Sequence, residues 1–95
     1  MGSYKLNEDA VEDFERLFDY GIDIFGLEQA KHYADGLRHR FLEIAKTPLL
    51  WQAVDHIRAG YRRSVYESHS IYYRIDDDNV EIMRILGRED IENQR

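Results

Sequence analysis

Several features are missing from this 95-residue chain, and each absence narrows what it can be. It has no cysteine, which excludes disulfides and thiolate chemistry and favours a reducing compartment. No apolar run approaches the roughly 18 residues that a membrane span needs. The start, Met1-Gly2-Ser3, does not resemble a signal peptide. We therefore expect one small cytoplasmic domain over residues 1–95, without membrane association.

Positive charge is also scarce, because 13 Lys and Arg face 19 Asp and Glu, for a net charge of −6. Residues 48–75 are locally basic with four arginines and two acids, whereas residues 1–47 and 76–95 each carry a net −4. Nucleic-acid binding normally needs a broad basic footprint that neutralises phosphates. The chain lacks such a footprint overall, and only the segment 48–75 offers one locally.

Two segments in the first half carry apolar residues at helical spacing. The first follows Asn7, a residue type that caps helices, and Asp13 lies on its expected solvent face. The second stops before Pro48, because the residue before proline is pushed out of the helical region. The short link at Gly26 predicts an antiparallel hairpin. The expected buried stripes are Val11, Phe14, Phe18, Ile22 and Phe25 in the first helix, and Ala30, Tyr33, Ala34, Leu37, Phe41, Ile44 and Ala45 in the second.

Two glycines lie inside these helical patterns. Gly21 predicts a kink or early fraying, because glycine costs about 1 kcal/mol against alanine in a helix. Gly36 suggests a close approach of the two helices. Beyond Pro48, we expect Trp51 to close one end of the core, and residues 55–58 to form a short strand or the entry to one.

Residues 58–86 predict a strand meander, rich in aromatic and β-branched residues and broken by polar turns at 68–69 and 76–79. Its last run, 80–86, is apolar on both faces, which is typical of a central strand covered on both sides. With residues 4–6 as a further strand, the order is β-αα-βββ. The fold class is α+β with two layers: an N-terminal strand and a helical hairpin packed on an antiparallel sheet. The polar residues 87–95 are expected to fray.

Catalytic and metal-binding patterns are weak. His32 and His39 lie seven residues apart, without the i,i+4 spacing of a helical metal site or an obvious third ligand. His69, at a turn, is either a general acid or base or a hydrogen-bonding residue at a strand end. Residues 76–78 are three aspartates that lack the glycine and closing glutamate of a calcium loop. We expect no cofactor and no metal.

Arginines and interleaved tyrosines in the meander are the strongest functional signal. Arginine presents a rigid donor fork to carboxylates and phosphates, and tyrosine offers contact area at little entropic cost. Arg84 and Arg74 could instead pair with internal acids. The cluster as a whole favours a surface that binds a target, either an acidic protein segment or a nucleic-acid backbone. Its candidate residues are Arg58, Arg62, Arg63, Tyr66, His69, Tyr73, Arg74, Arg84 and Arg88.

The same stretch resembles the ParE branch of the RelE/ParE toxin superfamily, and the resemblance extends through nearly the whole chain. The matching residues are Arg58-x-Gly60-Tyr61-Arg62, Ser68-His69-x-Ile71-x-Tyr73-Arg74 and Glu81-Ile82-x-Arg84-Ile85-Leu86, with Tyr4-x-Leu6, Ala10, Asp13, Phe25-Gly26, Gln29-Ala30, Tyr33, Leu37 and Pro48. It implies the same β-αα-βββ fold.

The resemblance also implies a function and partners. ParE-like proteins are toxins of bacterial type II toxin–antitoxin systems that poison DNA gyrase by binding, without being nucleases. A ParD-like antitoxin wraps a C-terminal arm around the toxin's helices and sheet. The two together repress their own promoter, so the toxin contacts DNA only indirectly, through that complex. By this resemblance the chain is a gyrase-directed binding toxin rather than an enzyme, encoded by a plasmid-stabilisation type of module.

Two alternatives stay open. A RelE-like, ribosome-dependent mRNA endonuclease would use His69, Arg62 and Arg88 for acid–base and phosphate chemistry. Such nucleases carry an arginine where this chain has Ser70, and a basic residue where it has Glu89, which argues against RNA cleavage. The chain also differs from ParE, with Leu86-Gly87-Arg88 in place of Leu-His-Gln and Trp51 in place of a small residue. The second alternative is a non-toxic family member that only binds an antitoxin.

Overall fold

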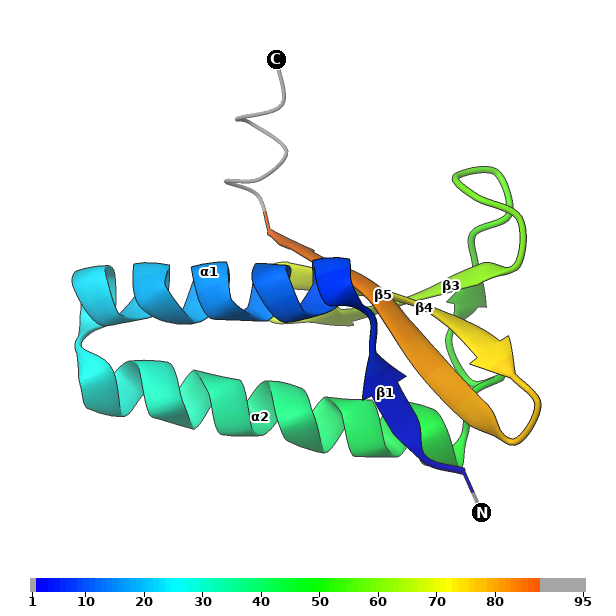
Figure 1. The fold of residues 1–95 in the computed structure, drawn as a ribbon, viewed down its shortest axis with the longest axis horizontal. Helices are drawn as coiled ribbons and strands as arrows, with labels where there is room; N and C mark the ends of the chain where they lie inside the picture. Colours follow the sequence, from blue (N-terminus) through cyan, green and yellow to red (C-terminus); the bar gives the residue numbers. More distant parts are fainter. Residues whose placement is uncertain (1, 88–95) are drawn as a thin grey trace.

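A computed structural model describes residues 2–87 of the chain. Two long helices lie on one side of a five-stranded sheet (Figure 1). The prediction of a two-layer α+β fold in the order β-αα-βββ is confirmed, with one additional two-residue strand. The elements are β1 (Tyr4–Leu6), α1 (Glu8–Phe25), α2 (Leu27–Lys46), β2 (Gln52–Ala53), β3 (Tyr61–Tyr66), β4 (His69–Asp76) and β5 (Asn79–Gly87).

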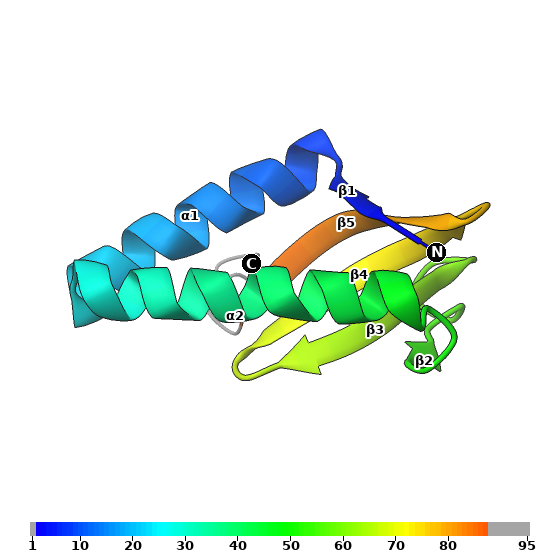
Figure 2. The ribbon, with the colours of Figure 1, turned by 90° about the horizontal axis from the view of Figure 1, so that it is seen from below.

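The sheet is mixed rather than wholly antiparallel. Its strand order is β1-β5-β4-β3-β2, and β1 pairs with β5 in parallel, whereas the other pairs are antiparallel. A parallel neighbour was not expected, and it arises because the chain crosses from β1 to β5 through the whole hairpin and meander. β4 is the central strand, and β5 has strands on both sides only from Val80 to Ile82, while the helices cover one sheet face only (Figure 2). The expectation that both faces of β5 are covered is therefore wrong.

Helix α1 begins as predicted, because the Asn7 side chain accepts a hydrogen bond of 2.9 Å from the Ala10 amide. Its buried face differs from the predicted stripe, since Val11 is 41% exposed and Phe25 67% exposed. The helix packs at the edge of β5, where a small residue and a paired carboxylate fit, rather than flat on the sheet. Its buried residues are Ala10, Asp13 and Leu17, so the placement of Asp13 on the solvent face was wrong.

Helix α2 follows its predicted stripe, whose alanine, leucine, isoleucine and phenylalanine members are all buried. Gly26 joins the helices with φ 92°, in the region that favours glycine. Helix α1 continues through Gly21 to Phe25, and a Cβ at Gly21 would lie 3.4 Å from the Cβ of Ala30. The helices therefore approach closely there and not at Gly36, which faces the Tyr66 hydroxyl of β3 instead.

The link from α2 to β3 was predicted incorrectly. Residues 55–58 form a turn and not a strand, because the Asp55 carboxylate accepts a 2.8 Å bond from the Gly60 amide and closes the loop. The short strand lies earlier, at β2, and pairs with Arg62 and Arg63. Trp51 is half-buried and packs against the core, as expected.

The core lies between α2 and the inner, helix-facing side of the sheet. Its largest fully buried side chains include Leu37, Phe41 and Ile44 from α2, and Ile71, Tyr73, Ile82 and Ile85 from the sheet. Within residues 2–87, no helix is long and apolar enough to cross a membrane. The predicted fraying of 87–95 concerns residues that, apart from Gly87 in β5, lie outside the described part.

Candidate functional site

The nine candidate target-binding residues do not share one surface. On β3 and β4 the paired positions Arg62–Tyr73 and Tyr66–His69 point toward the helices, as do the buried Ser64 and Ile71. Alternation along a strand sends the intervening residues to the opposite, outer face. The meander therefore divides the predicted cluster into an inner set and an outer set.

Two members of the inner set fix the loop that follows α2. The Tyr73 hydroxyl donates to the Pro48 carbonyl at 2.5 Å, and the Arg62 guanidinium donates to the Trp51 carbonyl at 2.6 Å. Tyr73 is fully buried. Burial raises the pKa of the Tyr73 hydroxyl to about 12, although the nearby Arg62 charge opposes the shift. Both side chains satisfy carbonyls of a loop that has no strand partner.

Tyr66 and His69 join the other end of the inner face to α2. The Tyr33 hydroxyl lies 2.7 Å from His69 Nδ1 and donates to the Tyr66 carbonyl at 3.3 Å. The ring of Tyr66 packs edge-on to Tyr33, and its hydroxyl occupies the space that a side chain at Gly36 would fill. His69 is 8% exposed. In this structure the hydrogen-bonding interpretation of His69 describes its surroundings better than that of an accessible general base.

Sequence analysis missed Arg40, which reaches from α2 to the edge of β3 that faces β2. Its guanidinium donates to the Val65 carbonyl at 2.9 Å and to Ser64 Oγ at 2.8 Å. It also lies over the rings of Trp51 and Tyr66, at 5.7 and 5.3 Å from their centroids. Because β2 pairs only with residues 62 and 63, Arg40 satisfies an edge carbonyl that β2 leaves without a strand partner.

The outer set is the accessible one. Arg74 donates two hydrogen bonds to Glu81 Oε1, at 2.9 and 2.6 Å, which raise the pKa of its guanidinium. Arg63 is half-buried on the same face, and within residues 2–87 no hydrogen bond or ion pair of its side chain is found. Arg58 lies in the exposed turn before β3, with its guanidinium 5.8 Å from the Tyr61 ring centroid. Arg88 lies outside the described residues.

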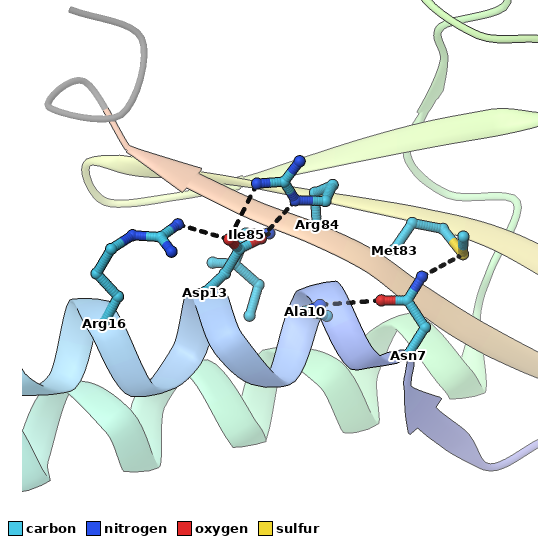
Figure 3. Close-up of polar contacts among 7 residues, drawn as sticks. All are labelled: Asn7, Ala10, Asp13, Arg16, Met83, Arg84 and Ile85. Atoms are coloured by element: carbon cyan, nitrogen blue, oxygen red, sulfur yellow. Dashed lines mark hydrogen bonds and ion pairs between the residues drawn. The ribbon is translucent and has the colours of Figure 1, made fainter. Parts of the chain in front are cut away.

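Arg84 is held by Asp13, as Figure 3 shows. Asp13 Oδ2 accepts from Arg84 Nε at 2.7 Å and from the Ile85 amide at 2.9 Å, and Oδ1 accepts from Arg84 Nη2 at 3.1 Å. Arg16 adds a third donor group at 2.6 Å. Strand β1 pairs with β5 from Val80 to Ile82 and no further. After Ile82, the Asp13 carboxylate takes the place of a strand partner for β5.

The Asp13 carboxylate is 2% exposed, and burial alone would raise its pKa. The bonds from Arg84, Ile85 and Arg16 outweigh burial and hold the pKa of Asp13 below its ordinary value. It is therefore charged at neutral pH. One sequence signal was present: Asp13 falls between Ala10 and Leu17, at the spacing of a buried stripe.

A groove runs along the helices beside β1, with a volume of about 380 Å³. Its lining is largely apolar and aromatic, with one charge of each sign at Glu15 and Arg38. The Arg38 guanidinium lies 5.1 Å from the Phe14 ring centroid. Such a groove suits an amphipathic segment of a partner. The remaining lining residues are Tyr4, Leu6, Val11, Phe18 and Phe41.

Metal ligands do not gather within residues 2–87: no group of three or more histidine, aspartate or glutamate side chains there could hold an ion.

The chain is similar in sequence to known proteins of one family. Residues 4–92 match the family model described as ParE toxin of type II toxin-antitoxin system, parDE. The chain is 37% identical over 86 residues to Toxin ParE1 of Caulobacter vibrioides, covering 90% of this chain and 88% of that protein. It is 32% identical over 84 residues to Toxin ParE1 of Mycobacterium tuberculosis, covering 87% and 86%.

Solved structures share the fold. A chain from the chromosomal ParDE TA system of P. aeruginosa superposes with a TM-score of 0.80 at 19% identity, covering 92% of this chain and 96% of that one. The solution structure of HP0894 from Helicobacter pylori superposes with a TM-score of 0.58 at 18% identity, covering 96% and 99%. At these identities the likeness concerns the fold alone.

Proposed function

This chain belongs to the ParE toxin family of type II toxin–antitoxin systems, and from that membership we propose that it binds bacterial DNA gyrase and poisons it without catalysing a reaction of its own. The observation that carries the proposal is the match to the ParE family over residues 4–92. The toxin acts in the cytosol, where gyrase is found.

The geometry supports binding rather than RNA cleavage. His69 lies at the inner face against Tyr33, and Arg62 donates to the Trp51 carbonyl, so neither side chain is presented with the other in an open cleft. A general base must come within hydrogen-bonding reach of the proton that it removes. An endonuclease would have to release both side chains from these contacts first.

We assign target contact to the accessible members of the predicted set, Arg58, Arg63 and Arg74. Arg63 and Arg74 lie on the outer sheet face, which no described helix covers, and Arg58 precedes β3 in an exposed turn. Arg62, Tyr66, His69 and Tyr73 support this surface from the inner face, and Arg84 supports it at the β5 edge through Asp13. The proposed target is an acidic surface of gyrase, because a guanidinium fork recognises carboxylates.

A ParD-like antitoxin neutralises the toxin in this proposal, with its arm in the groove between the helices and β1. The apolar lining of that groove suits an amphipathic segment, and Arg38, which lines it together with Glu15, can pair with an acidic residue of that segment. DNA is then contacted only through the toxin–antitoxin complex.

The test is DNA supercoiling by purified bacterial gyrase with the folded protein titrated in. We expect supercoiling to stop, cleaved DNA to accumulate, and a cognate antitoxin in excess to reverse both effects. His69→Gln serves as the control, because it should leave gyrase inhibition unchanged if the chain acts by binding. Unaffected gyrase, together with mRNA cleavage on ribosomes that His69→Gln abolishes, would favour the endonuclease instead.

A further inference from the structure

The tip of the helical hairpin, residues 19–28, projects beyond the end of the sheet in both views of the fold (Figures 1 and 2). Four large apolar side chains there are at least half exposed, because the sheet does not extend far enough to cover them. Clustered exposure of this kind marks an interaction site more often than scattered single residues do. They are Tyr20 at 50%, Ile24 at 55%, Phe25 at 67% and Leu27 at 50%.

The tip is also held in shape. Gly21 and Ala30 bring the two helices into van der Waals contact, and Gly26 makes the connection in a single residue at φ 92°. A surface that is already ordered loses little conformational entropy when it binds.

Beneath the tip lies a hollow of about 450 Å³, between the hairpin and the β3–β4 turn. Tyr20 and Phe25 of the tip line it, together with Tyr33 of α2 and Glu67 and His69 of the turn region. It shares only Phe18 with the lining of the groove assigned above to the antitoxin. The tip and the hollow therefore form a second concave surface.

Charge distinguishes this surface from the groove. The hollow's lining contains Glu67, His32 and His69 but no lysine or arginine, whereas both Glu15 and Arg38 line the groove. Asp19, Asp23 and Glu28 are exposed carboxylates of the tip itself, and no lysine or arginine occurs between Arg16 and Lys31. An apolar hollow with acidic surroundings is complementary to an apolar segment that carries basic residues.

The walls also restrict the partner's backbone. Two helices and a hairpin turn make up the lining, and the amides and carbonyls inside helices already pair with one another. A partner strand would find no edge to pair with here, so the partner must satisfy its own backbone, as a helix does.

We propose that the hairpin tip and the hollow beneath it dock a basic, amphipathic helical segment of a partner protein. Its apolar side chains fill the hollow against Tyr20 and Phe25, and its lysines or arginines lie beside Glu67 and the tip carboxylates. This site is independent of the gyrase proposal and of the outer sheet face.

The probe is a synthetic helical leucine–lysine peptide of about 18 residues, with a leucine–glutamate peptide of the same pattern as control. Binding is measured by fluorescence anisotropy, and amide shifts in NMR spectra of the full chain locate it. We expect the lysine peptide alone to bind, with shifts confined to residues 17–33 and 67–69. Equal binding of both peptides, or shifts elsewhere, would overturn the proposal.

Two pairs of substitutions separate this site from general attraction to an acidic protein. Phe25→Ser with Leu27→Ser removes the apolar tip and should weaken binding at least tenfold. Leu49→Ser with Leu50→Ser removes an even more exposed apolar pair, at 70% and 71%, outside the hairpin and should leave the affinity unchanged. Equal loss in both variants would contradict the proposal.

A third variant tests the charge, and sedimentation tests the competing occupant. Glu67→Gln should weaken binding several-fold and reduce its salt dependence. If the chain alone forms a dimer that the tip substitutions abolish, the occupant is a second copy and the proposal of a basic partner fails.

Discussion

The two faces of the meander use the same residue types for different purposes. On the inner face, Arg62 and Tyr73 donate to loop carbonyls. On the outer face, Arg74 is exposed and donates to Glu81, and Arg63 is half-buried with no hydrogen bond or ion pair of its side chain among the described residues. Arg62 and Arg63 are adjacent in sequence, yet one holds the fold and the other is offered to a partner. Successive residues of a strand point to opposite faces of the sheet, and this alternation decides which arginine takes which role.

Asp13 and Arg84 at the edge of β5 form the most consequential of the internal contacts. Asp13→Ala removes the acceptor of the Ile85 amide and the carboxylate that pairs with Arg84. We expect it to lower the free energy of unfolding by about 3 kcal/mol, a large part of a small domain's stability. Urea unfolding measures this. Asp19→Ala, at an exposed position of the same helix, should leave the free energy of unfolding almost unchanged. Equal losses in the two variants would show that the Asp13 contacts do not stabilise the fold more than an exposed residue does.

Acid should weaken the Asp13 contacts at the β5 edge. The pKa of Asp13 is lower in the folded than in the unfolded chain, so its contribution is complete above the unfolded pKa of about 4 and is lost as pH falls through the folded value. The stability difference between wild type and Asp13→Asn should therefore shrink below pH 4 in urea titrations. A difference that stays constant down to pH 2 would contradict the assigned charge.

The inner face gives a smaller effect at the alkaline end. Tyr73→Phe removes one hydrogen bond to the Pro48 carbonyl and should cost about 1 kcal/mol at neutral pH. The folded pKa of Tyr73, about 12, exceeds the unfolded value near 10, so its contribution is present below pH 10 and lost as pH rises toward 12. Wild type should lose more stability than Tyr73→Phe across that window. Parallel losses would refute the burial effect.

The outer face should give the smallest effect on stability. Arg74→Ala breaks the contact with Glu81, in which the Arg74 side chain is 48% exposed, so that solvent screens the ion pair. We expect its urea midpoint to match that of wild type within experimental error, while its inhibition of gyrase weakens. A clear loss of stability would show that Arg74 stabilises the fold, as the inner-face residues do.

Much of the fold could be predicted from sequence because its patterns are local. The α2 stripe and the turn at 77–78 follow from helical spacing and from turn-forming residues, whereas the first turn lies at 67–68, one residue before its predicted place at 68–69. The parallel pairing of β1 with β5 could not be predicted, since nothing local specifies a partner more than 70 residues away. Asp13 was misplaced because a charged residue is usually solvent-facing, and only tertiary context provides Arg84.

The site was predicted less well for a related reason. Alternation along a strand could place Arg62 and Arg63 on opposite faces, but it could not say which face the helices cover, because that depends on tertiary packing. His69, assigned to a turn, begins β4 instead, and this position sets which neighbours point inward. Arg40 had no sequence signal, since its contacts join α2 to the distant edge of β3.

The most direct test compares Arg62→Ala with Arg63→Ala, measuring gyrase affinity and free energy of unfolding for both. We predict that Arg63→Ala weakens gyrase binding at least tenfold with unchanged stability. Arg62→Ala should lose about 1 kcal/mol of stability and keep its affinity at temperatures where it is folded. Weakened binding from Arg62→Ala alone, with Arg63→Ala indistinguishable from wild type, would contradict the assignment of the outer face to the target.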